Sequence, residues 1–319
     1  MDKCMLDVQG TRPPVAIHLS RVGVTNVKKL VEVNRGEKRP IILIAEFDAY
    51  VDLPYDQKGV HMSRNPEVIN EVLEEATKDQ IYEVESLCAE MAKRLLERHL
   101  YANKAEIRMN SELMIRRKPP ISKSSTQEIV KLLAQAVACR EGKDITIRKM
   151  VGAEVTGMTA CPCAQEIIRE NIKERLVKIG LKKNEIDSVL ESIPMPTHNQ
   201  RGVGTIMIEV PEGYDIRVET LFEIIEKSMS SSVYELLKRE DEAKVVEIAH
   251  MNPMFVEDCV RMMIERIVNR FTDLPDDTQV TVRQINEESI HRHNALAERI
   301  ASLGELRNEI NDQKAFKTD

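Results

Sequence analysis

Two cysteines that flank a proline form the most chemically distinctive segment of the sequence, Cys161-Pro-Cys163. The proline stiffens the backbone, so at least one thiolate is expected to be presented from a turn. Thiolate is a soft ligand that suits zinc or iron. Two small buried side chains are an equally good interpretation of an isolated Cys-x-Cys pattern. The pattern therefore marks a candidate metal ligand and leaves the structural alternative open.

A histidine in a polar loop is the second candidate. His198 is followed by the polar residues 199–201. Neutral imidazole is the commonest nitrogen ligand of metals, and its second ring nitrogen needs a partner that fixes the tautomer. A lone loop histidine is also often simply solvated, so this signal is weak when it is considered alone.

A third group of polar residues follows a predicted strand at residues 280–285. It contains Glu288, His291 and His293. Two histidines spaced two residues apart on an extended segment point to the same face, which suits ligation or proton transfer. A solvated polar end of the strand is the competing interpretation.

The fourth group precedes a predicted helix whose N-terminus we assign to Asn65-Pro66. His61, Ser63 and Arg64 lie just before it. Free backbone N–H groups at a helix N-terminus, together with a guanidinium, can hold a phosphate. A helix cap with a surface arginine would have the same pattern.

The bulk composition excludes several classes of protein. The chain has 319 residues and a net charge of −7, with 3% aromatic residues and no tryptophan, so nucleic acid is not expected as a partner. No apolar run is long enough to span a bilayer, and the first ten residues do not resemble a signal peptide. Six irregularly spaced cysteines are typical of reduced thiols. We therefore expect a cytoplasmic protein without membrane contact.

Hydrophobic periodicity predicts the elements that must position these residues. The first half shows strands at 30–33 and 45–53 around a hairpin loop at 35–40, helices from 65 and 84, and strands at 107–115 and 129–139. The second half shows strands at 145–155, 205–210 and 280–285, with helices at 218–229 and 255–271. A helical insertion covers 164–193, and the charged tail beyond Arg307 is expected to fray.

This order predicts an α+β fold built from two modules, residues 1–140 and 141–319. Each module is expected to be an antiparallel sheet with two helices packed on one face. The repeat is one of pattern and not of residue identity. No P-loop, Rossmann glycine pattern or His-Glu-x-x-His motif is present, so the residues alone indicate no more than a Cys/His metal site in an α+β protein.

Taken together, the motifs resemble those of the type IB GTP cyclohydrolases, from about Asp7 to about Ala297. The insertion between Cys163 and His198 is similar to that of the archaeal branch, the ferrous-iron enzymes of methanopterin synthesis. The matching segments are His61-Met-Ser-Arg64, Cys161-Pro-Cys163, His198-Asn-Gln-Arg201-Gly202, the block from Leu237 to Glu247, Asn252-Pro-x-Phe-Val-Glu257-Asp258 and Glu288-Ser-Ile-His291-x-His293.

The resemblance implies a tunnelling fold and a homo-oligomer, either a dimer or a tetramer, with active sites at subunit interfaces. It implies one divalent metal ion per subunit, with Fe(II) preferred and Zn(II) or Mn(II) as alternatives. Cys161 and His198 would be metal ligands, and Cys161 is also counted among the catalytic residues. Glu247 would be a third ligand or an anchor for the guanine edge. Ser232 replaces a glutamate of some bacterial relatives, which leaves the third ligand open, with Glu247 or a histidine as the substitute.

The remaining candidate residues receive their roles from the same resemblance. Glu288, His291 and His293 would be the acid–base element of the catalytic site. The substrate GTP would be bound by His61, Ser63, Arg64 and Arg201. The basic run 116–118 is a further candidate for contact with the triphosphate.

The implied reaction is a metal-dependent opening of the guanine ring of GTP at C8. Formate would be released and a 7,8-dihydroneopterin phosphate formed, expected as the 2′,3′-cyclic phosphate with loss of diphosphate. Two rival interpretations remain at this point. One is a related nitrile reductase that uses a cysteine nucleophile. The other is a non-catalytic pterin- or nucleotide-binding protein.

Overall fold

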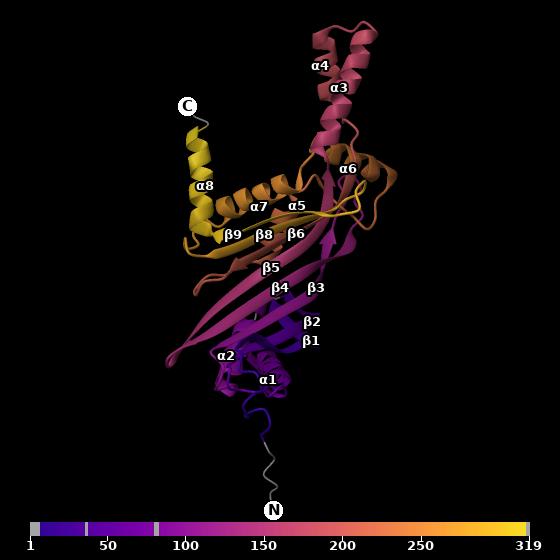
Figure 1. Cartoon of the computed structure of the whole chain (residues 1–319). Helices are drawn as coiled ribbons and strands as arrows, with labels where there is room; N and C mark the ends of the chain where they lie inside the picture. The colour runs from indigo at the N-terminus through magenta and orange to yellow at the C-terminus, as the bar shows by residue number, and fades with distance from the viewer. Residues whose placement is uncertain (1–6, 36–37, 80–82, 317–319) are drawn as a thin grey trace, which may run out of the picture. The chain divides into compact units, whose positions relative to one another are not determined.

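The computed structural model describes residues 7–35, 38–79 and 83–316, and it confirms the α+β class (Figure 1). The strands are β1 (Leu19–Arg35), β2 (Lys38–Leu53), β3 (Lys104–Arg117), β4 (Thr126–Glu141), β5 (Asp144–Ala160), β6 (Asn199–Glu209), β7 (Ser231–Ser232), β8 (Gln279–Glu287) and β9 (Ala295–Ser302). The helices are α1 (Arg64–Asp79), α2 (Val84–Arg98), α3 (Pro162–Lys178), α4 (Lys183–Ser192), α5 (Val218–Glu226), α6 (Arg239–Met251), α7 (Val256–Arg270) and α8 (Leu303–Phe316).

The strands follow one another in the hydrogen-bonded order β1-β2-β3-β4-β5-β6-β8-β9, and β7 pairs with β5. The pairings β1–β2, β2–β3, β6–β8 and β8–β9 are antiparallel. The chain divides into two compact units. The first unit comprises 1–113, 131–151 and 209–215, and the second comprises 114–130, 152–208 and 216–319. The boundary at residue 140 between tandem modules stays a prediction.

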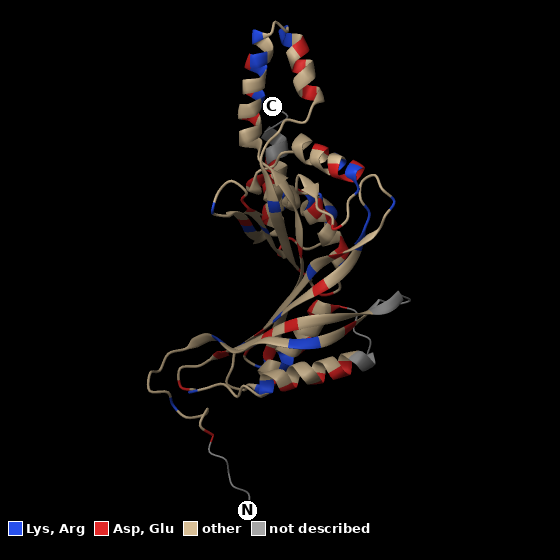
Figure 2. Cartoon of the chain, turned by 90° about the vertical axis from the view of Figure 1, so that its right-hand side faces the viewer, with Lys and Arg blue, Asp and Glu red and all other residues tan. Residues whose placement is uncertain are grey.

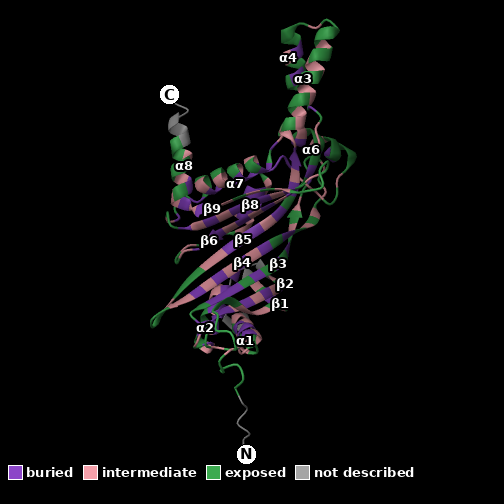
Figure 3. Ribbon diagram, in the orientation of Figure 1, coloured by how far each residue is buried: buried purple, intermediate pink, exposed green. Residues whose placement is uncertain are grey.

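The first unit has its core between strand β2 and the helices α1 and α2. On β2, Ala45, Phe47 and Ala49 are fully buried, as the alternating sequence pattern predicts. The buried apolar residues of the two helices are Val68, Ile69, Val72, Leu87, Met91 and Leu95. On the same strand Ile42 and Ile44 are 70% and 69% exposed, so β2 is apolar on both faces near its start. The banding of buried and exposed residues along the strands is visible in Figure 3.

The second unit has an equivalent core under α5 and α7. Helix α7 packs on β8 and β9 and contacts α5. Its buried residues Val256, Cys259, Val260, Met263 and Ile267 repeat every three or four positions, which is the pattern that predicted this helix. They meet Ile206, Ile208, Val280 and Val282 from the strands beneath.

The predicted helical insertion is a hairpin of two helices, α3 and α4, that extends away from the rest of the second unit (Figure 1). No residue of α3 is buried, and both helices carry many charged side chains (Figure 2). A small apolar cluster of Ile186, Leu190 and Met195 joins α4 to α3. The hairpin is therefore held mainly by contacts between its own two helices. It begins one residue after Cys161.

Three expectations about local structure were wrong. Helix α1 begins at Arg64, so Asn65 is not its N-cap; Asn65 is fully buried, and its side chain donates to the carbonyl of Ala49 over 3.0 Å. The tail does not fray directly beyond Arg307, because helix α8 continues to Phe316, and Arg307 anchors this helix by donating to the carbonyls of Phe271 and Leu274. Helix α5 ends at Glu226, three residues before the predicted end. The turn of the predicted hairpin loop, residues 36 and 37, lies outside the described residues.

A buried aspartate fixes the start of α6. Asp241 is fully buried, and its carboxylate accepts the N–H groups of Ile121, Ser122 and Lys238 over 2.8–3.1 Å. Burial alone would raise the pKa of Asp241, but these donors hold that pKa at about 2. The charged form of Asp241 thus joins the β3–β4 loop to α6.

Because the folded-state pKa lies below the value of about 3.9 in an unfolded chain, Asp241 stabilises the fold above about pH 4. This contribution is lost as the pH falls towards 2. We expect Asp241→Asn to lower the melting temperature by several degrees at pH 7. The difference in melting temperature between the variant and the natural protein should become smaller below pH 4. Asp258→Asn is the matched control, since Asp258 caps only its own helix α7. Equal shifts for both variants, measured by circular dichroism, would contradict the assignment.

Candidate active site

The backbone around Cys161 is held at the point where β5 ends and α3 begins. The N–H of Ala160 donates to Ser230 Oγ over 3.0 Å, and the carbonyl of Ala160 accepts the N–H of Met254 over 2.9 Å. Cys161 has extended backbone angles and is the N-cap of α3, with Pro162 in the first turn. The proline lacks an N–H and fits this position.

The same point joins β5 to the segment before β6. The N–H of Cys161 donates to the carbonyl of His198 over 3.0 Å, and Thr197 Oγ1 donates to the carbonyl of Cys161 over 2.7 Å. These bonds connect residues 36 and 37 positions apart. The structure thus brings the two predicted metal ligands, Cys161 and His198, side by side along their backbones.

The hydrogen bonds of His198 select one tautomer of its ring. Gln200 Oε1 lies 3.0 Å from Nδ1, and Gln200 Nε2 donates to Glu288 Oε1 over 3.4 Å. Since the amide nitrogen of Gln200 faces the carboxylate, its oxygen is left to accept from Nδ1–H of His198. Protonation at Nδ1 leaves Nε2 with its lone pair, which is the arrangement expected of a metal ligand or a general base.

Glu288 completes this polar group. Its side chain is 11% exposed, and Oε2 lies 3.9 Å from His198 Nδ1. Oε2 is buried and has no hydrogen-bond partner among the described residues. A buried carboxylate oxygen without a donor favours a nearby positive charge. The side chain of His198 is only 16% exposed. The interpretation of His198 as a solvated loop residue is therefore wrong.

The cysteines fall into two kinds. Burial raises the pKa of Cys88, and burial together with the neighbouring Asp258 raises the pKa of Cys259 to about 12, so both thiols stay protonated. Cys161 is partly exposed and Cys163 is exposed, and both are free thiols. The interpretation of Cys-x-Cys as two buried small residues is thus wrong, and Cys161 is accessible to a ligand.

The donor types at this position fit a divalent metal ion such as Fe(II) or Zn(II). Cys161 offers a thiolate and His198 an imidazole nitrogen, while Glu288 supplies unpaired negative charge. Among the described residues of the single chain, no three His, Cys, Asp or Glu side chains form a group that could hold a metal ion. The third ligand therefore stays a prediction.

The contacts of the other predicted catalytic residues lie outside this group. Glu247 lies on the exposed side of α6, where its carboxylate accepts from Lys244 over 2.9 Å. His291 and His293 lie in the exposed loop between β8 and β9, and their rings stack with centroids 5.2 Å apart. In the same loop, the Oγ of Ser289 lies 3.5 Å from Nδ1 of His198. The roles predicted for Glu247, His291 and His293 stay predictions.

Two residues that hold the site together had no predicted role. Gln165, on the first turn of α3, donates to the carbonyls of Met195 and His250 over 3.1 and 2.7 Å. His250, near the end of α6, lies 3.4 Å from Asn199 through its Nε2. Both residues link segments that are more than 25 positions apart, so local pattern carries no signal for them.

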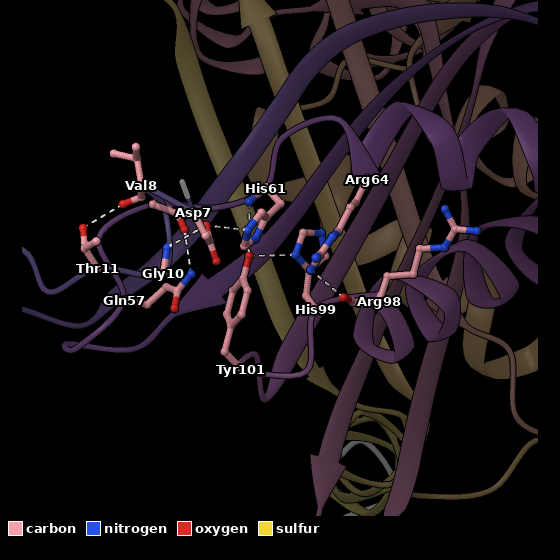
Figure 4. A network of polar contacts seen from close by, with 11 residues as sticks. Asp7, Val8, Gly10, Thr11, Gln57, His61, Arg64, Arg98, His99 and Tyr101 are labelled. Atoms are coloured by element: carbon pink, nitrogen blue, oxygen red, sulfur yellow. Dashed lines mark hydrogen bonds and ion pairs between the residues drawn. The ribbon is translucent and has the colours of Figure 1, made fainter. Parts of the chain in front are cut away.

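The predicted substrate-binding residues His61, Ser63 and Arg64 belong to the first unit. Figure 4 shows the polar contacts of His61 and Arg64. His61 Nε2 lies 3.1 Å from Asp7 Oδ1, and the N–H of His61 donates to the hydroxyl of Tyr101. Arg64 Nη1 donates to the carbonyl of Arg98 at the end of α2 over 2.8 Å. Ser63 is exposed.

A buried histidine, His99, supports this network through two hydrogen bonds. His99 Nε2 contacts Asn65 Oδ1 over 3.0 Å, and Nδ1 contacts the hydroxyl of Tyr101 over 2.8 Å. Burial, with help from the charge of Arg64 and from His61, lowers the pKa of His99 to about 4. His99 is therefore neutral at physiological pH, and it places Asn65 and Tyr101 beneath the loop that carries His61.

The remaining candidates for contact with phosphate differ in availability. The guanidinium of Arg117 is mostly buried and forms ion pairs with Glu128, over 3.0 Å, and with Glu226. Arg116 and Lys118 are exposed, as is Arg201 on β6. Arg117 is therefore engaged within the second unit, which leaves its two neighbours as the accessible cations of the basic run.

The fold is similar to that of uricase from Arthrobacter globiformis, with a TM-score of 0.52 over 89% of this chain and 93% of that chain. The sequences are only 8% identical, so this similarity concerns the tunnelling fold alone. None of the helices in the described part of the chain is long and apolar enough to cross a membrane.

The sequence defines the family. Residues 5–297 match the model of the type I GTP cyclohydrolase folE2 family, so the chain belongs to this family and is an enzyme of the GTP cyclohydrolase type. GTP cyclohydrolase MptA of Methanosarcina mazei is 54% identical over 97% of this chain and 99% of its own length. GTP cyclohydrolase MptA of Methanothermobacter thermautotrophicus is 55% identical over 97% of each chain.

The buried position of His99 predicts a pH dependence of stability. In an unfolded chain the histidine pKa is about 6.5, so between about pH 6.5 and 4 the unfolded state binds more protons. We expect the free energy of unfolding to fall by roughly 2–3 kcal/mol as the pH is lowered from about 6.5 to about 4.

Urea denaturation of the His99→Gln variant at pH 7 and at pH 4.5 measures this dependence. The variant should lack most of the difference between the two pH values, whereas His293→Gln, which removes an exposed histidine, should keep it. An unchanged pH dependence in His99→Gln would show that His99 titrates normally.

Proposed function

We propose that this chain is a metal-dependent GTP cyclohydrolase that opens the guanine ring of GTP at C8 and releases C8 as formate. We further propose that the product is 7,8-dihydroneopterin 2′,3′-cyclic phosphate, formed with loss of diphosphate at the first step of methanopterin synthesis. The observation that carries the proposal is the joining of Cys161 to His198, with Nδ1 of His198 held by Gln200, in a chain of this family. The relatives named MptA support the finer assignment.

The proposed reaction consists of hydrolysis and ring closure. One water molecule adds to C8 of the guanine ring, and the C8–N9 bond breaks to leave a formamide on N7. A second water molecule hydrolyses this formamide, so the C8–N7 bond breaks and C8 leaves as formate. The opened ribose rearranges and condenses with the freed amine, which returns one water molecule. Attack of a ribose hydroxyl on the α-phosphorus expels diphosphate and forms the cyclic phosphate. No oxidant or reductant is required at any of these steps.

Cys161 and His198 would hold the divalent metal ion, with Glu247 or a residue of a partner subunit as a further ligand. When bound, such an ion polarises the reacting carbon and lowers the pKa of a water molecule. Gln200 keeps the lone pair of His198 on Nε2, and the carboxylate of Glu288 stabilises positive charge that develops on this ring. His291 and His293 are exposed and can exchange protons with solvent.

The roles in substrate binding follow from the family resemblance. His61, Ser63, Arg64 and Arg201 are assigned to the triphosphate and the sugar, and Glu247 to the guanine edge if it is not a metal ligand.

Homo-oligomer formation is part of the proposal, either as a dimer or as a tetramer with shared active sites. The exposed apolar residues Leu30, Ile42 and Ile44 on β1 and β2 support it, because such surfaces are usually covered by another protein surface.

The family match favours this function over the two rival interpretations. The first experiment is anaerobic incubation of the metal-stripped protein with GTP, alone and with Fe(II), Zn(II) or Mn(II). We expect metal-dependent formate together with a pterin whose mass is that of the cyclic phosphate. A triphosphate product would remove the finer assignment only, and GTP recovered unchanged with every metal would contradict the cyclohydrolase itself.

The two cysteines of the Cys-Pro-Cys segment provide a matched pair of variants. Cys161→Ala should lose both the bound metal and formate production to background, while its circular dichroism spectrum stays unchanged. Cys163→Ala should keep both, because its exposed side chain is assigned no role. Metal content by elemental analysis and formate release measure the outcome. Retained activity in Cys161→Ala would remove this residue from the site.

The tautomer argument predicts a separate effect for Gln200. Gln200→Leu removes the acceptor for Nδ1 of His198, and the loss of such a partner weakens metal affinity by about 10–100-fold. A competition titration with a chromophoric chelator measures this affinity. Gln135→Leu is the control, because Gln135 bonds to Glu106 in the other unit. Equal affinities in the Gln200 variant and the natural protein would refute the positioning role.

A further inference from the structure

A cleft of about 550 Å³ lies between α5 and α7, the two helices that cover the sheet of the second unit. Its size falls within the range of small-molecule sites. None of the residues assigned to the cyclohydrolase site lines it. Its lining consists of Arg217, Glu219, Thr220, Glu223, Ile224 and Lys227 from the α5 segment, and Arg266, Asn269 and Arg270 from α7.

The lining residues lie on one face of each helix. On α7, Arg266, Asn269 and Arg270 are spaced three and four residues apart, so their side chains share a face. On α5, Thr220 and Glu223 have the same spacing. The opposite faces of both helices are buried in the core, so these polar faces are free to form the walls of the cleft.

The cleft is basic within an acidic protein. Four cationic side chains and two carboxylates line it, which leaves a net charge of +2 in a chain whose net charge is −7. One of the cations is paired, since Lys227 lies 3.2 Å from Glu223. Arg217 is at the N-cap of α5, where the free N–H groups of the helix add to the positive potential.

The donors of Arg266 point most directly to a ligand. Its side chain is partly buried in the wall of the cleft, and its Nε is buried without a hydrogen-bond partner among the described residues. A buried guanidinium donor left without an acceptor costs free energy. Arg270 lies beside it, with its guanidinium carbon 5.9 Å from the centroid of the Phe271 ring. An anion with several oxygens would accept from the guanidinium groups of Arg266 and Arg270, which both line the cleft.

We propose that this cleft is a second binding site, which takes a small molecule carrying a chain of phosphates. Arginine forks match phosphate oxygens in geometry and charge. Cations at both ends of α5 and on α7 suit a ligand with several negative charges better than a single phosphate. A free polyphosphate and a nucleoside triphosphate share this chemistry. The inference goes beyond the cyclohydrolase function and does not rest on it.

The experiment is isothermal titration calorimetry of the full-length protein with inorganic tripolyphosphate and, separately, with ATP. Arg270→Gln and Arg217→Gln each remove one cation from the cleft. Arg261→Gln is the matched control, since Arg261 is an exposed arginine of the same helix that pairs with Asp258 outside the cleft. Melting temperatures verify that each variant is folded.

We expect each cleft variant to weaken binding of at least one probe by about tenfold or more, as for the loss of one charged hydrogen bond. The control should bind as the natural protein does. Selective loss of ATP binding would identify a nucleotide site, and loss of both probes a polyphosphate site. Affinities that are unchanged in both cleft variants, or reduced equally in Arg261→Gln, would overturn the proposal. Because the readout is binding, failure of the cyclohydrolase assay leaves this test valid.

Discussion

The second unit depends on the hydrogen bonds that hold the backbone at the end of β5. Ala160 and Cys161 form hydrogen bonds with Ser230, Met254, Thr197 and His198, so three separate segments meet at one short stretch of chain. Two of these bonds come from side chains, which can satisfy a strand end where no neighbouring strand continues. As a result, Cys161 is held at a defined position. Helix α3 starts there with Pro162, which has no backbone N–H and needs no acceptor.

The polar group of His198, Gln200 and Glu288 shows how the site differs from the core around it. A buried polar atom normally has a partner, because its desolvation otherwise costs free energy. Glu288 Oε2 departs from this rule, whereas the carboxylate of Asp241, in the same unit, is fully supplied with N–H donors. Asp241 is therefore suited to hold a loop in place, while Glu288 keeps capacity for a cation or a developing charge.

The first unit uses polar residues in another way. His99 and Asn65 are fully buried but hydrogen-bonded, and together with Tyr101 they support the loop that carries His61 and Arg64. A neutral histidine can both donate and accept a hydrogen bond, so it can join two partners without introducing a buried charge. The predicted substrate residues are thus placed by a rigid polar framework, although their own contacts with a substrate stay a prediction.

The sequence by itself determined the elements with strong periodicity and the residue types that could do chemistry. The alternation on β2 and the three-to-four spacing on α7 predicted both elements, because each buries a broad apolar face. Helix α6 was not predicted as a helix, since only Asp241, Val245 and Ala249 are buried in it. The family resemblance predicted Cys161 and His198 as ligands of one metal ion. Only the tertiary structure decided that a backbone hydrogen bond joins these two residues, that Gln165 contacts His250, and that Asn65 is a buried core residue. These outcomes depend on hydrogen bonds between segments far apart in the chain, and no local pattern records such partners.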